Sequence, residues 1–146
     1  MEAENNIALT SGQHVSIREK IAKVQQSIGT ITKNGVNPHF KNKYATLDEV
    51  WNRVKTELKA ARLMSYCTTE LIGEYWSLTT HIADIDSKEE ICGSFPLPAN
   101  AGPQQVGSAM TYARRYTLCA LLQIVTADED DDGNAAQGKT TPPPNF

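Results

Sequence analysis

Residues 63–98 constrain the fold of this 146-residue chain more than any other segment. They contain three runs rich in β-branched and aromatic residues, which are separated by the turn formers Gly73-Glu74 and Asp86-Ser87. Runs of this composition joined by short turns are typical of antiparallel strands connected by hairpins. The segment therefore predicts a three-stranded antiparallel meander.

Two helices are predicted before the meander. Ser16 with Glu19, and Thr46 with Glu49, have the spacing of capping boxes, in which each side chain binds the backbone N–H of the other residue. Apolar residues then recur at intervals of three and four, the period of a helix face: Ile17, Ile21, Val24, Ile28 and Ile31 in the first helix, and Val50, Val54, Leu58 and Ala61 in the second. We expect the first helix to end at about Lys33.

A third helix is predicted from Pro103 to about Leu122, because proline suits the first turn of a helix. One side of this helix gathers mainly small and apolar residues: Val106, Ala109, Met110, Ala113, Thr117, Ala120 and Leu121. We expect that side to pack closely against the sheet. Arg115 falls on the opposite side, flanked by Tyr112, and is expected to cross the exposed face. Arg114 projects from another edge, past the rim of the core.

The predicted order of elements is helix, helix, three strands and helix, which is an α+β fold. We expect one domain over residues 16–126, since about 100–150 residues is the commonest domain size. Residues 1–15 are predicted to be a flexible N-terminus, and residues 127–146 an acidic, proline-rich disordered tail. Because the sequence shows neither a membrane-spanning stretch nor a signal-like start, we expect a cytoplasmic protein.

Cysteines and tryptophans are interpreted as structural residues. Cys67, Cys92 and Cys119 are odd in number and widely separated, which fits neither a disulfide framework nor a Cys-x-x-Cys site, so we expect buried thiols. Trp51 and Trp76 are expected in the core or in a subunit interface. We find no nucleophile paired with a base and no metal-ligand spacing, and we therefore predict neither catalytic residues nor a cofactor.

Charge is divided unevenly along the chain, although the net charge is only −3. Residues 1–127 hold 13 Lys and Arg against 12 Asp and Glu, and the run Asp128–Asp132 (DEDDD) adds five negative charges. The basic part lies between Lys33 and Arg62, with seven positive residues against three negative ones. A basic stretch of this kind in an acidic chain indicates a nucleic-acid partner.

The tail contains patterns that suggest nucleotide or metal binding. Residues 133–140 (GNAAQGKT) match the P-loop pattern, but a P-loop needs a strand before it and a helix after it. Here an acidic run precedes the pattern and the prolines 142–144 follow it, so we reject a nucleotide site. The run 128–132 offers carboxylates without a rigid scaffold, and we expect a solvated acidic segment.

The segment QQVGSAMTYARRYTLCALLQIVTADEDDDGN, residues 104–134, closely resembles the signature of the ERF (essential recombination function) family of phage single-strand annealing proteins. The segment NPHFKNKYATLDEVWNRVKTEL is similar to that family's N-terminal block, with an aromatic, a basic residue and Tyr-Ala-Thr before a helix. The resemblance covers residues 16–134. It implies a β-β-β-α core, binding of single-stranded DNA, annealing of complementary strands without ATP, and assembly into rings or filaments.

Annealing needs cations for phosphates and flat surfaces for bases. The predicted DNA-binding residues are Lys41, Lys43, Tyr44, Arg53, Lys55, Tyr112, Arg114 and Arg115. Phe40 and Tyr44 are interleaved with the lysines, and each either stacks on a base or packs beneath a loop.

Two other classes of function stay open from the sequence. A metal-dependent, DNA-acting hydrolase would use the acidic run 128–132 and would lose activity when Asp130 and Asp132 became Asn. A protein-interaction module would ignore DNA and recruit a partner through the tail. The expected partners of an annealing protein are single-stranded DNA, further copies of the chain and a replication or recombination protein bound by the tail, with no membrane.

Overall fold

The computed structural model describes residues 13–29, 35–36 and 43–125. The predicted acidic tail lies outside these ranges, together with its P-loop-like pattern. The first residues of the predicted flexible N-terminus lie outside them as well, as do Phe40 and Lys41.

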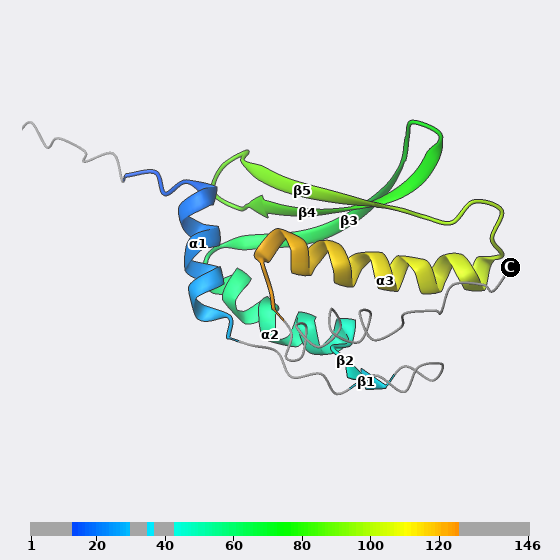
Figure 1. Cartoon of the computed structure of the whole chain (residues 1–146). Helices are drawn as coiled ribbons and strands as arrows, with labels where there is room; N and C mark the ends of the chain where they lie inside the picture. The colour runs from blue at the N-terminus through cyan, green and yellow to red at the C-terminus, as the bar shows by residue number, and fades with distance from the viewer. Residues whose placement is uncertain (1–12, 30–34, 37–42, 126–146) are drawn as a thin grey trace, which may run out of the picture.

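The predicted element order is confirmed (Figure 1). The helices are α1 (Ile17–Ser27), α2 (Leu47–Ala60) and α3 (Pro103–Leu122). The main strands are β3 (Leu63–Ile72), β4 (Tyr75–Asp84) and β5 (Glu90–Pro96), and two short strands, β1 (Gly35–Val36) and β2 (Lys43–Tyr44), pair with each other. The pair β1–β2 was not predicted from the sequence.

Both predicted capping boxes are present. The Ser16 backbone N–H donates to the Glu19 carboxylate at 3.0 Å, and the Glu19 N–H donates back to Ser16 Oγ at 3.3 Å. Thr46 and Glu49 make the same exchange at 2.7 and 3.2 Å. The prediction that the first helix continues to about Lys33 was wrong, because Ile28 leaves the helical region with ψ near 93°.

The strands β3, β4 and β5 form an antiparallel sheet in that order, with Tyr66 opposite His81 and His81 opposite Cys92. Figure 1 shows α2 and α3 on one side of the sheet. Alternate residues of β4, namely Leu78, Thr80 and Ile82, point toward these helices and are fully buried. The helices therefore cover one face of the sheet.

The main core joins α1, α2, the beginning of β3 and the C-terminal half of α3. Its members are apolar side chains that meet from different elements: Ile17, Ile21, Val24, Ile28, Ala45, Val50, Val54, Leu58, Leu63, Ile82, Leu118, Leu122 and Ile124. A smaller cluster of Leu78, Leu97 and Ala113 lies under the N-terminal half of α3. Helix α3 is therefore anchored from about Ala109 to its C-terminal end, whereas residues 103–108 are mostly exposed.

The expected burial of the cysteines was wrong, and both tryptophans lie outside the core of the single chain. Cys67 and Cys92 are exposed and Cys119 is half-buried, whereas Trp51 is 38% and Trp76 59% exposed. Cys92 lies on the sheet face that the helices do not cover, and Trp76 lies in the part of the β3–β4 hairpin beyond the end of β5. The core alternative for the tryptophans is thus excluded, and the subunit-interface alternative stays a prediction.

Among the described residues, no helix combines the length and the apolar character that crossing a lipid bilayer would require.

Candidate nucleic-acid interface

Small and hydroxyl-bearing residues hold helix α3 close to the sheet. Thr117 Oγ1 lies 2.6 Å from Thr80 Oγ1 and also donates to the Ala113 carbonyl at 2.8 Å. A Cβ atom placed on Gly93 of β5 would lie 3.5 Å from the Leu121 side chain, which shows how near the helix runs. This close packing against the sheet fixes the directions in which the remaining side chains of α3 project.

An aromatic pair lies on the exposed side of α3. Tyr112 and Tyr116 are one helical turn apart, their ring centroids are 4.3 Å apart, and they are 47% and 46% exposed. The Tyr112 hydroxyl donates to the Tyr116 hydroxyl at 2.8 Å, and this hydrogen bond raises the pKa of Tyr112 above its usual value of 10.0. Phe95 of β5 supports both rings, with centroids 6.0 and 5.9 Å away. The pair offers flat apolar surface to solvent.

The two adjacent arginines have different surroundings. Arg114 is exposed, and its side chain makes no hydrogen bond or ion pair with any other residue that the structure describes. Arg115 is half-buried: its Nη1 donates to the Ala45 carbonyl at 3.1 Å, and its guanidinium lies 5.1 and 5.2 Å from the ring centroids of Tyr112 and Tyr116.

The expectation that Arg115 crosses the exposed face of α3 was therefore wrong, because its side chain is half-buried. Helix α2 packs against a second side of α3 and buries Leu118 and Leu122, so the covered part of α3 is wider than the predicted stripe. Ala120, which was expected in that stripe, is exposed. Arg114 projects into solvent as predicted.

The predicted cations of α2 also differ from each other. Arg53 is tied down, because Nη1 donates to Glu57 Oε1 at 3.2 Å and Nη2 donates to the Ser27 carbonyl at the end of α1. Lys55 is exposed, and its ammonium donates to Asn52 Oδ1 at 2.8 Å without a carboxylate partner among the described residues. Lys55 is thus the more available cation for a ligand.

The N-terminal block of predicted DNA-binding residues is placed only in part. Lys43 and Tyr44 form β2, whose partner strand is β1, but their side chains lie outside what the structure describes. Ala45 follows directly and accepts the hydrogen bond from Arg115. The structure therefore brings the backbone of this block next to α3.

Sequence reasoning did not include Tyr116 and Phe95 among the site residues. Tyr116 lies four residues after Tyr112, the interval that places two side chains on the same helix face, and this spacing could have revealed the pair. Phe95 comes from β5, so its contact with the pair depends on the packing of α3 against the sheet. Nothing in the local sequence signals that contact.

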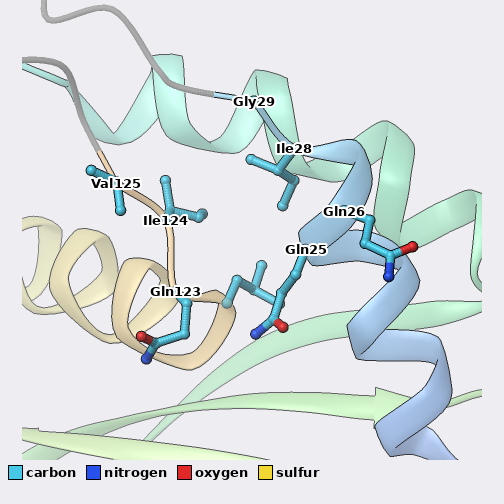
Figure 2. A pocket seen from close by; sticks show the side chains of 8 residues that line it. Gln25, Gln26, Ile28, Gly29, Gln123, Ile124 and Val125 are labelled. Carbon is cyan, nitrogen blue, oxygen red and sulfur yellow. The ribbon is translucent and has the colours of Figure 1, made fainter.

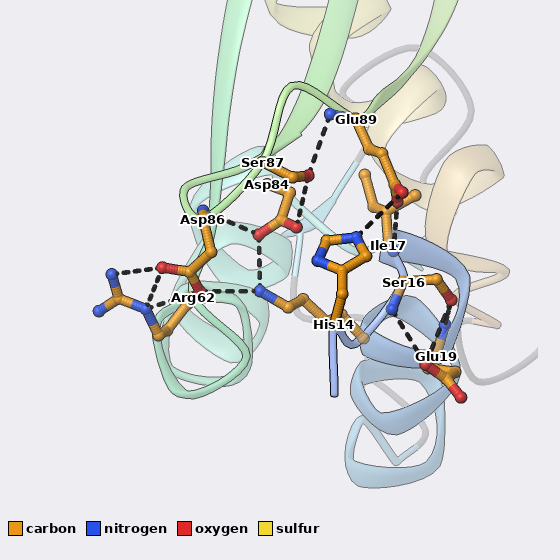
Figure 3. A network of polar contacts seen from close by, with 10 residues as sticks. His14, Ser16, Ile17, Glu19, Arg62, Asp84, Asp86, Ser87 and Glu89 are labelled. Carbon is orange, nitrogen blue, oxygen red and sulfur yellow. Dashed lines mark hydrogen bonds and ion pairs between the residues drawn. The ribbon is translucent and has the colours of Figure 1, made fainter. Parts of the chain in front are cut away.

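A second polar cluster lies at the α1 end of the sheet (Figure 3). The Lys20 ammonium donates to the buried Asp84 at 2.6 Å and to Asp86 at 3.0 Å, and Arg62 donates to both oxygens of Asp86. The hydrogen bond from Arg62, followed by that from Lys20, lowers the pKa of Asp86 to about 2. The hydrogen bond from Lys20 likewise lowers the pKa of Asp84.

Neighbouring groups extend this cluster. Glu89 accepts the Ile17 backbone N–H at 2.7 Å and contacts His14 at 3.2 Å, and the bond from Ile17 is the main cause of a lowered Glu89 pKa. The potential ligand atoms of His14, Asp84 and Glu89 all lie within 4.8 Å of one another, a spacing that suits one metal ion. Because the Lys20 ammonium already neutralises Asp84, we interpret the cluster as an ion-pair network that joins α1 to the β4–β5 turn.

Two hollows are open on the described surface. One lies between the C-terminal ends of α1 and α3, where Gln25, Gln26, Gln123 and Val125 face it (Figure 2). Its described lining consists of amides, backbone and aliphatic groups, without an ionisable side chain. The other is an apolar groove beside the aromatic pair, with Tyr75, Phe95, Pro96, Leu97, Pro98, Ala99, Ser108, Ala109 and Tyr112 along it. This groove widens the apolar surface next to Tyr112.

The family model of the ERF superfamily matches residues 17–145, nearly the whole chain. No significant match was found among curated proteins or among solved structures. The matched range includes both sequence blocks on which the resemblance was based, as well as every helix and strand described above. The chain therefore belongs to the ERF superfamily.

Proposed function

We propose that this protein binds single-stranded DNA and anneals complementary strands without ATP, in phage homologous recombination. Membership of the ERF superfamily indicates a function in recombination and annealing. The observation that carries the proposal is the exposed pair Tyr112 and Tyr116 on the same helix as the exposed Arg114, whose side chain has no partner among the described residues. Flat aromatic surface and available cations are the two elements with which proteins bind single strands irrespective of sequence.

The mechanism that we propose is non-covalent. Arg114 and Lys55 neutralise phosphates, which releases counterions and favours binding. Tyr112 and Tyr116 stack on bases, an interaction worth about 1–3 kcal/mol per base. Holding two strands near each other raises their effective concentration, and this proximity accelerates pairing without a chemical step. Lys41, Lys43 and Tyr44 belong to the same proposal, together with the half-buried Arg115.

Assembly into a ring or filament is also part of the proposal, because one small domain can contact only a few nucleotides. The exposed apolar residues of the β3–β4 hairpin support it: Leu71, Ile72, Tyr75 and Trp76. Contiguous exposed apolar residues are typical of surfaces that contact other proteins. We further propose a cytoplasmic location and a replication or recombination partner for the tail.

The test is annealing of two complementary fluorescent oligonucleotides without nucleotide or divalent metal, over a series of salt concentrations. We expect fast annealing that slows as salt rises, because phosphate contacts weaken with salt. Arg114→Ala should slow annealing, whereas Arg18→Ala, which removes an exposed arginine from α1, should leave the rate unchanged.

Both variants are first compared with the wild type by circular dichroism, so that an unfolded variant is not mistaken for an inactive one. A wild-type protein that neither binds nor anneals single strands at low salt would contradict the proposed function. Equal slowing by Arg18→Ala and Arg114→Ala would contradict the placement of the interface on α3.

A further inference from the structure

We infer that Arg115 is a positioning residue of the proposed interface, which orients Tyr112 and Tyr116 for bases, whereas its neighbour Arg114 contacts phosphate. This inference rests on the proposed function. Its starting point is the difference between the two side chains: Arg114 is exposed without a described partner, and Arg115 is half-buried among defined contacts.

The first contact of Arg115 is with the two tyrosine rings. Its guanidinium carbon lies 5.1 Å from one ring centroid and 5.2 Å from the other, within the range of a cation–π interaction. A planar guanidinium can stack on aromatic faces, which an ammonium group cannot do in the same way. Arg115 thus restrains two side chains that are otherwise about half exposed and would sample several rotamers.

The second contact of Arg115 reaches the other sequence block. Nη1 donates at 3.1 Å to the carbonyl of Ala45, a buried residue between strand β2 and the N-cap Thr46 of α2. Strand β2 consists of Lys43 and Tyr44, two of the predicted DNA-binding residues. One side chain therefore holds the aromatic pair of α3 and the end of this basic block in a fixed relation.

These contacts distinguish a positioning role from a phosphate contact. A phosphate contact depends on charge, so its loss reduces the dependence of binding on salt, by about 0.7 in the slope of log affinity against log salt for single strands. A positioning role depends on the planar shape of the group. Replacement by lysine, which keeps the charge, should then be nearly as harmful as replacement by alanine.

The experiment measures binding of a fluorescent oligothymidylate by anisotropy over a salt series, for the wild type, Arg114→Ala, Arg115→Ala and Arg115→Lys. We expect Arg114→Ala to reduce the salt slope by about 0.7. Both Arg115 variants should bind about 5- to 150-fold more weakly, the loss of one stacked base, with an unchanged slope. An oligonucleotide carrying 2-aminopurine, whose fluorescence falls on stacking, should lose its response in both Arg115 variants.

Several results would overturn the inference. If Arg115→Lys binds like the wild type while Arg115→Ala shows a smaller slope of log affinity against log salt, Arg115 is a phosphate contact. If both folded variants bind and quench 2-aminopurine normally, Arg115 serves only the fold. If Arg115→Ala does not fold, Arg115→Lys still decides between these roles.

The inference can also be separated from the proposed function. The near-ultraviolet circular dichroism of the tyrosines should change in Arg115→Lys without any DNA, because the rings lose their restraint. A wild-type protein that does not bind DNA would contradict the proposed function. An unchanged near-ultraviolet tyrosine signal in Arg115→Lys would contradict the positioning role.

Discussion

The α1 end of the sheet and the exposed side of α3 both carry charged groups, but they use them in opposite ways. At the α1 end, Lys20 and Arg62 bind Asp84 and Asp86 over 2.6–3.0 Å. On α3, Arg114 extends into solvent without a described partner. In the first region the charged side chains pair with each other, whereas in the second a charged side chain is exposed without a described partner.

This difference shows why a count of basic residues does not locate a DNA interface. A phosphate could reach Lys20 only by replacing the buried Asp84, which would lose its own partner in the exchange. In the proposed function, a phosphate at Arg114 would replace only water and loosely held counterions. We expect pairing within the fold, and not charge alone, to separate structural cations from cations that bind a ligand.

The largest effect is expected from Asp84→Ala, which breaks the closed region. Asp84 accepts hydrogen bonds from Lys20, from Ser87 Oγ at 2.8 Å and from the Asp86 backbone N–H at 3.1 Å. Its removal leaves the Lys20 ammonium at a mostly buried site without its nearest carboxylate, and we expect a large fall in melting temperature. Thermal unfolding followed by circular dichroism measures the change.

The matched control for this variant is Glu74→Ala, which removes an exposed carboxylate from the β3–β4 turn and should leave the melting temperature nearly unchanged. If Asp84→Ala has the same melting temperature as Glu74→Ala, the ion-pair network does not stabilise the fold. The contrast between the α1 end of the sheet and the exposed side of α3 would then be wrong.

The next effect in size concerns DNA affinity. Tyr112→Leu combined with Tyr116→Leu keeps apolar area but removes both flat rings, so we expect affinity for single strands to fall about 5- to 150-fold for each stacked base that is lost. The melting temperature should change little, since both rings are about half exposed. Anisotropy titration with a labelled oligonucleotide measures the affinity.

Phenylalanine at the same two positions serves as the control, because it keeps the rings and removes only the bond between the hydroxyls. We expect near-normal binding. An equal loss in the phenylalanine and leucine variants would mean that the phenol groups, and not the ring faces, contact DNA.

Local signals made much of the fold predictable. The capping boxes at Ser16 and Thr46 predicted where two helices begin, and the turn formers at Gly73 and Asp86 predicted the hairpins. Signals of this kind act over a few residues, so a sequence displays them directly. The early end of α1 was missed because the apolar period continues through Ile28 although the backbone does not stay helical.

The site was less predictable because it depends on contacts between distant elements. A helical projection of α3 contains no information about α2, which covers a second side of α3. The hydrogen bond from Arg115 to the Ala45 carbonyl, just before α2, is equally invisible in that projection. The core alternative for Trp76 was wrong because strand lengths set how far the β3–β4 hairpin extends past β5. Arg114 was predicted as exposed because the helical projection places it away from the small and apolar side of α3.

A moderate fall in melting temperature is expected at low pH. The folded-state pKa of Asp86 is about 2 against an ordinary value of 3.8, so its ion pairs stabilise the fold above about pH 4 and are lost as the pH falls toward 2. Lowered pKa values at Asp84 and Glu89 act in the same direction. We expect the melting temperature to fall over this range, and less so in Arg62→Gln, which lacks the main partner of Asp86. Parallel curves for the two proteins would exclude Arg62 as the cause.

The smallest effect compares two cations of the same helix. Lys55 has no described carboxylate partner, whereas Arg53 binds Glu57 and the Ser27 carbonyl. Lys55→Ala should reduce the salt slope of DNA binding by about 0.7, while Arg53→Ala should leave the slope unchanged and lower the melting temperature instead. Anisotropy titrations over a salt series and thermal unfolding of both variants decide this. Since both residues belong to α2 and carry the same charge, a loss of slope in Arg53→Ala but not in Lys55→Ala would show that position, and not pairing, selects the cations that meet DNA.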